Sequence, residues 1–98
     1  MDVNTAPVCR YAFLLEKPVL YIRPISLKEN VVINVKFLTI SHNKAYNNYV
    51  VSLYGEDKNV NWEDVMTSKY GFLNLRCNDT FFLENSELEG FLLHFGLK

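Results

Sequence analysis

Apolar and polar residues alternate over positions 31–37, near the middle of the chain. A period of two residues is typical of a β-strand that buries one face. Past this stretch the pattern changes, because Leu38 and Ile40 are apolar where the preceding alternation would place polar residues. We therefore expect a central strand over 31–40, with one end covered on both faces.

The same criteria predict an ordered series of elements along the rest of the chain. They are strands at 8–16, 19–23, 31–40 and 48–54, a helix at 61–70, strands at 72–77 and 80–84, and a helix at 86–95. Pro18 and Pro24 bound the second strand, which favours an edge position or a sharp connection because proline cannot donate to a ladder. Residues 1–7 are expected to be frayed.

A polar loop over 41–47 separates the central strand from the next one, and this arrangement is typical of an antiparallel hairpin. Asn61 is a good helix N-cap, with Asp64 three residues on. Ser86 and Glu89 have the spacing of a capping box for the last helix. Two glycines are expected to end these helices, Gly71 and Gly96.

The predicted order β-β-β-β-α-β-β-α indicates an α+β protein that forms a single small domain over residues 1–98. Its sheet should be antiparallel and curved, or a partly open barrel, with two short helices. From Val19 on, the order resembles that of an OB-fold in topology, without any family motif. Hydrophobic residues make up 49% of the chain, which is enough for a core.

Several features favour a soluble protein in a reducing, cytoplasmic compartment. No apolar run approaches about 18 residues, so we expect no membrane span. The polar start of the chain lacks the apolar region of a secretory signal. Cys9 and Cys77 have no CxxC spacing and fall in strand patterns, so we interpret them as reduced, small hydrophobic residues. The many asparagines are compatible with a small viral or phage accessory protein.

No motif indicates catalysis, a cofactor or a metal. His42 and His94 lie far apart in sequence with no ligand spacing between them. Ser41 and His42 are neighbours on a strand end, so their side chains should point in opposite directions. The four glycines form no phosphate-binding loop. We therefore expect a protein that is not an enzyme.

Charge is unevenly divided along the chain, although the formal net charge is only −1. Residues 1–49 carry six Lys or Arg and three Asp or Glu, whereas residues 50–98 carry four and eight. Such polarity suits docking to a partner. Scattered charges on a solvated surface would explain it equally well.

Our main functional hypothesis is a non-catalytic interaction protein that binds another macromolecule, most readily a protein. The hairpin loop is the candidate site, because tyrosines offer large contact area at a low cost in side-chain entropy. Its partner-binding residues would be His42, Lys44, Tyr46 and Tyr49. We also expect a homodimer, because a sheet of short strands leaves open edges.

The alternative is a single-stranded nucleic-acid-binding protein with an OB-like barrel. Lysines interleaved with aromatic residues on a curved sheet can hold phosphates and stack bases. The residues for this role would be Lys36, Lys44, Tyr46 and Tyr49. The absence of a net basic charge counts against this alternative.

Overall fold

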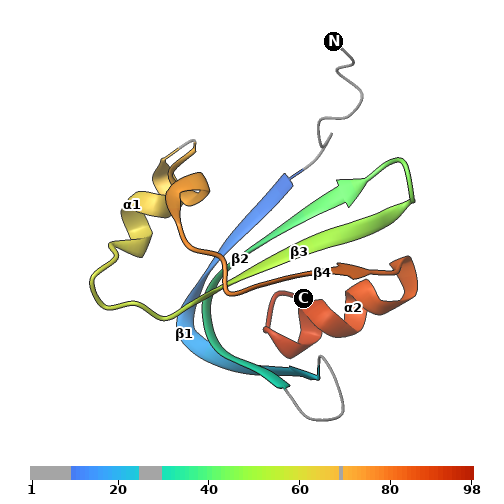
Figure 1. Ribbon diagram of the computed structural model, residues 1–98, viewed down its shortest axis with the longest axis horizontal. Coiled ribbons are helices and arrows are strands. Elements are labelled where there is room, and N and C mark those ends of the chain that lie inside the picture. Colours follow the sequence, from blue (N-terminus) through green and yellow to red (C-terminus); the bar gives the residue numbers. More distant parts are fainter. Residues whose placement is uncertain (1–9, 25–29, 69) are drawn as a thin grey trace.

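The computed structural model describes residues 10–24, 30–68 and 70–98. It contains one four-stranded antiparallel sheet with the strand order β1-β2-β3-β4 (Figure 1). The strands are β1 (Arg10–Pro24), β2 (Asn30–Asn43), β3 (Asn48–Gly55) and β4 (Asp79–Leu83). The helices are α1 (Trp62–Thr67), the short 3-10 helix η2 (Gly71–Asn74) and α2 (Asn85–His94). The predicted α+β class and the curved, open antiparallel sheet are confirmed.

Strand β1 joins two strands that the sequence predicted to be separate. Its pairing with β2 continues across a register shift between Leu14 and Val19. Pro18 lies within this irregularity, and β1 is an edge strand, where a missing N–H is tolerated. The proline therefore interrupts the ladder without ending the strand. Residues 1–7 and Cys9 lie outside the described residues.

A bulge in β2 explains why the alternation of the central strand changes phase. Val35 pairs with Gly55 and Phe37 pairs with Tyr54, so Lys36 is an extra residue on β2. Val35 before the bulge and Leu38 after it belong to the same core cluster. The Phe37 ring lies elsewhere and stacks on Trp62. Phe37 and Leu38 are both fully buried. The expectation that this end of the strand is covered on both faces is confirmed.

The main core lies between the concave face of the sheet and α2, around which β1 and β2 curve (Figure 1). Phe91 and Phe95 of α2 are buried there, and their ring centroids are 4.8 Å apart. Tyr21 of β1 stacks on Phe81 of β4 with 5.7 Å between centroids. Aromatic rings thus fill the space between the two edge strands. Helix α1 lies outside this curve.

The capping box of helix α2 lies two residues earlier than the sequence predicted. Its N-cap is Glu84, whose side chain accepts from the N3 backbone while Glu87 accepts from the Glu84 N–H at 2.9 Å. The predicted Ser86 and Glu89 pair is therefore wrong, because β4 ends at Leu83 and the helix follows directly. Gly96 has φ +69°, which confirms it as the stop residue.

The segment between β3 and β4 differs most from expectation. Asn61 caps α1 through the Asp64 N–H, as predicted, but α1 ends at Thr67 and not at Tyr70. The strand expected over 72–77 is absent, because β4 pairs directly with β3 and occupies that side of the ladder. η2 forms there instead, and Gly71 begins it rather than ending α1.

Cys77 does not have the buried position that its apparent strand pattern suggested. It lies in the connection before β4 as an exposed free thiol. Its Sγ donates to the Asp79 carbonyl at 3.1 Å. Among the described residues, no helix is both long and apolar enough to cross a membrane.

Candidate functional site

The β2–β3 hairpin ends in a shorter turn than the sequence suggested. Strand pairing runs out to Asn43 and Asn48, which leaves only residues 44–47 as turn. The loop predicted over 41–47 is therefore too long, because its first three residues belong to β2. Asn47 has φ 50°, a left-handed conformation that asparagine tolerates better than most residues. The Asn43 side chain accepts from the Ala45 N–H at 3.0 Å, a local bond typical of Asx turns.

Side chains from two directions hold this turn in place. His42 Nε2 lies 3.2 Å from Asn47 Oδ1, and the His42 ring meets the Tyr49 ring edge-on with 5.1 Å between centroids. From the start of α2, Asn85 Nδ2 donates to the Asn47 carbonyl at 3.2 Å. The turn is therefore linked both to its own strands and to the helix.

All four turn residues are exposed, and Lys44 and Tyr46 carry the largest side chains among them. The Tyr46 side chain is 77% exposed, the highest value among the exposed large hydrophobic residues of the described chain. Tyr49 is half-buried and packs against the core below. We call residues 42–49 with Asn85 the hairpin tip. The structure thus brings the four predicted partner-binding residues together, two as an exposed surface and two as its support.

Lys36, from the alternative nucleic-acid set, lies apart from the hairpin tip. Seven residues of β2 lie between it and Lys44, which places the two roughly 25 Å apart along the strand. Its Nζ donates to the Glu16 carbonyl at 3.0 Å. The four residues of that set therefore do not form one continuous patch.

The clear pKa shifts occur at Tyr21 and Arg23, near the C-terminal end of β1. Burial raises the pKa of the Tyr21 hydroxyl, and this effect outweighs the opposing influence of Arg23. The hydrogen bonds from Arg23 to Asp79 raise the pKa of the guanidinium. Both groups are part of the packing between β1 and β4. No three His, Cys, Asp or Glu side chains gather as a metal site would need in the part of the chain that the structure describes.

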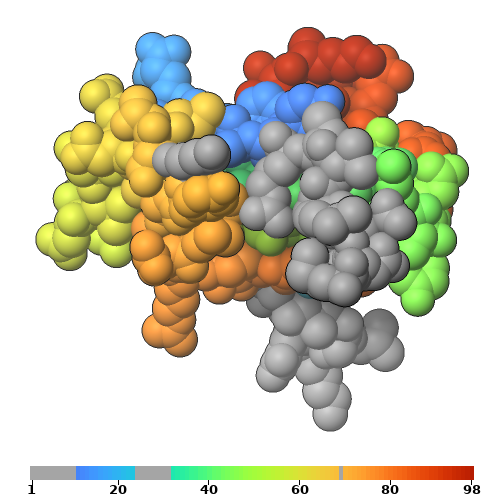
Figure 2. Space-filling model, turned by 90° about the horizontal axis from the view of Figure 1, so that it is seen from above, coloured from blue at the N-terminus to red at the C-terminus, as the bar shows by residue number. Residues whose placement is uncertain are grey.

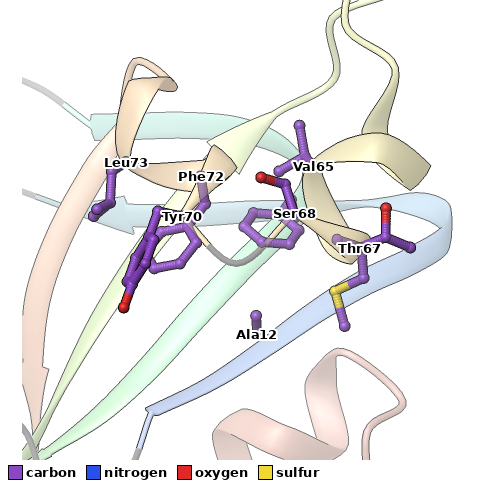
Figure 3. A pocket seen from close by; sticks show the side chains of 9 residues that line it. Ala12, Val65, Thr67, Ser68, Tyr70, Phe72 and Leu73 are labelled. Carbon is purple, nitrogen blue, oxygen red and sulfur yellow. The ribbon is translucent and has the colours of Figure 1, made fainter.

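A second surface feature surrounds α1, and the sequence did not predict it. A hollow of about 450 Å³ lies between α1, η2 and the outer face of the sheet (Figure 3). Its lining is mostly apolar and includes Ala12, Phe37, Val65, Met66, Tyr70 and Leu73. In the space-filling view, the segment from α1 to η2 forms a lobe apart from α2 (Figure 2).

A second hollow of about 460 Å³ lies beside the start of α1. Glu16, Lys36 and Glu63 line it together with Trp62. We call the two hollows and the helix between them the α1 surface. The apolar spacing of Val65, Met66 and Tyr70 is the only sequence signal for this surface, and it is equally typical of a helix that packs against a core.

Comparison with known proteins gives no match: no family model fits the chain, and no curated protein or solved structure is significantly similar to it. The hairpin tip and the α1 surface are therefore the features from which we infer a function.

Proposed function

We propose that this chain is a non-catalytic interaction protein that binds another protein through the hairpin tip. The observation that carries the proposal is Tyr46, which is 77% exposed on a turn held by His42 and Asn85. A tyrosine in this position offers an apolar ring and a polar hydroxyl to a partner. A turn already fixed before binding also loses less conformational entropy when the partner docks.

A protein partner fits the tip better than single-stranded nucleic acid does. Stacking platforms for bases combine aromatic rings with several cations that follow the phosphates. Among the described residues 42–49, the only Lys or Arg is Lys44. Lys36 is remote and already donates to a backbone carbonyl. The exposed free thiol of Cys77 also supports our proposal of a reducing, intracellular setting.

Affinity capture from an extract of the cells that express the protein tests this function. We expect wild-type bait to retain a protein partner with and without nuclease, and the variant Tyr46→Ala/Lys44→Glu to lose it. Both side chains are exposed, so the melting temperature should move by only a few degrees.

The matched control is Leu93→Ala/Lys98→Glu, which makes similar changes at exposed positions outside the hairpin tip. This control should retain the partner. Full capture by the Tyr46 variant would refute the site at the hairpin tip. Loss of the captured material on nuclease treatment, with binding that falls steeply as salt rises, would favour the nucleic-acid alternative instead.

A further inference from the structure

We propose that the α1 surface is a second binding surface, which accepts a peptide segment of a protein partner that carries large apolar side chains next to Lys or Arg. This inference concerns a different surface from the hairpin tip. It rests on the shape of the hollow, on the exposed apolar side chains around it and on the charge beside it.

The apolar side chains of α1 and η2 remain incompletely buried. Neither α1 nor η2 contains a buried residue. Met66 is 43% exposed, and Tyr70 and Leu73 are each 61% exposed, although all three line the same hollow. A short helix normally gains its stability by burying an apolar stripe. Here a large part of that stripe faces a hollow that an apolar side chain from a partner could fill.

Trp62 attaches helix α1 to the sheet, and a hollow lies on each side of the helix. The Trp62 ring stacks on Phe37 with 5.9 Å between centroids. Trp62 Nε1 also donates to the Asp57 carbonyl at 3.2 Å, which ties the helix to the preceding turn. Trp62 therefore holds α1 above the sheet, and the C-terminal half of the helix borders the apolar hollow.

The charge around α1 determines the chemistry of the partner. Glu16 of β1 and Glu63 of α1 line the second hollow. Three further exposed carboxylates lie in the turn before α1 and in its first turn: Glu56, Asp57 and Asp64. None of the five forms an ion pair with a described residue. Three lysines of the described chain oppose them, Lys17 beside Glu16, Lys36 in the hollow and Lys58 in the turn, so the carboxylates remain in excess.

An excess of unpaired carboxylates attracts basic groups and repels phosphates. The apolar hollow requires a large apolar side chain in addition. These two requirements together favour a basic, amphipathic peptide over nucleic acid and over an acidic segment.

A synthetic 14-residue peptide, built from leucine on one helical face and lysine elsewhere, provides the probe. Its binding to the full chain is measured by fluorescence anisotropy. Two matched peptides, with glutamate for lysine or serine for leucine, should bind at least tenfold more weakly. The affinity for the first peptide should fall as salt rises, because the exposed carboxylates are screened.

Variants of the chain locate the binding. We expect Met66→Gln/Leu73→Gln to weaken binding about tenfold and Leu93→Gln, at another exposed leucine, to leave it unchanged. Glu63→Lys should weaken binding several-fold, whereas the same reversal at Glu89 on α2 should not. Equal effects of the two charge reversals would show attraction to net charge alone and would refute the site.

Ala12→Met keeps the hollow apolar but fills part of its floor. This variant should weaken peptide binding to a similar extent. Circular dichroism should show that the variant is folded, so that a folding defect is not mistaken for loss of the site. Unchanged binding in both Ala12→Met and the Met66 double variant would overturn the proposal. The hairpin-tip variant Tyr46→Ala/Lys44→Glu should bind the peptide normally, which separates this test from that of the proposed function.

Discussion

Arg23 in β1 donates two hydrogen bonds to Asp79 in β4, at 2.7 and 2.6 Å. These strands are the two edges of the sheet and are not hydrogen-bonded to each other through their backbones. The Arg23 guanidinium also lies 4.9 Å from the centroid of the Phe81 ring. From α2, His94 Nε2 donates to the Leu20 carbonyl on β1 at 3.1 Å. Side chains and a helix thus join the edges of an open sheet, where a closed barrel would use a ladder.

The Arg23–Asp79 pair should contribute measurably to stability. The Asp79 side chain is only 8% exposed, so Asp79→Ala leaves Arg23 without its partner in a partly buried position. We expect a coupling free energy of about 1–3 kcal/mol from a double-mutant cycle with Arg23→Ala, measured by urea unfolding. The same cycle on the exposed Lys98–Glu89 pair should give a much smaller coupling free energy. A coupling near zero at Arg23–Asp79 would mean that the edges are held by the aromatic rings alone.

Alkaline pH should destabilise the protein through Tyr21. Burial raises the pKa of this hydroxyl in the folded state above its ordinary value of 10.0, so the unfolded chain loses its proton first. The stabilising contribution is therefore complete below about pH 10 and is lost as the pH rises through the folded-state pKa.

The comparison of wild type with Tyr21→Phe isolates this effect. Thermal melts from pH 7 to 11 should show the wild type losing stability relative to the variant only above about pH 10. Tyr46→Phe is the control, because the Tyr46 side chain is 77% exposed. Parallel curves for wild type and Tyr21→Phe would show that this hydroxyl is not protected from water.

Phe37 should be among the most costly residues to truncate. It is fully buried between Tyr54, at 5.5 Å between ring centroids, and Trp62. Phe37→Ala should cost about 3–5 kcal/mol, a large share of a small domain's stability. Phe82→Ala is the matched control, since this residue is 61% exposed on β4, and should cost less than about 1 kcal/mol. A small loss at Phe37 would mean that α1 does not cover this part of the sheet in solution.

The central hairpin could be predicted from sequence because its signal is local. Alternation and β-branched residues define β2, and the change of phase after Phe37 results from the bulge at Lys36. The sequence could not separate a bulge from a strand covered on both faces, and both are present. The sequence predicted two strands in place of β1, because proline usually ends a strand. Pro18 is tolerated within β1 because β1 is an edge strand.

The remaining differences depend on tertiary neighbours. Residues 72–77 alternate as a strand does, yet a strand forms only where a ladder has room, and β4 occupies the place beside β3. The four residues of the predicted partner-binding set lie near one another at the hairpin tip, but the loop is shorter than predicted, because pairing continues to Asn43. The α1 surface was missed, because an apolar stripe looks the same in sequence whether it fills a core or lines a hollow.

The β1–β2 pair should join two copies of the chain. Leu20, Ile22 and Val32 are 55%, 55% and 60% exposed. Ile22 pairs directly with Val32, and Leu20 shares the face of Ile22, so the three form one apolar stripe. Such a stripe on the face opposite α2 favours contact with a second copy, which would remove it from water.

We expect light scattering to report about twice the monomer mass of 11.4 kDa at micromolar concentrations and above. Ile22→Lys should shift the mass to that of the monomer, because a charge in the stripe opposes its burial. Phe82→Lys, at an exposed position on β4, should leave the mass unchanged. A wild-type mass of 11.4 kDa throughout this range would show that the stripe does not join two copies of the chain.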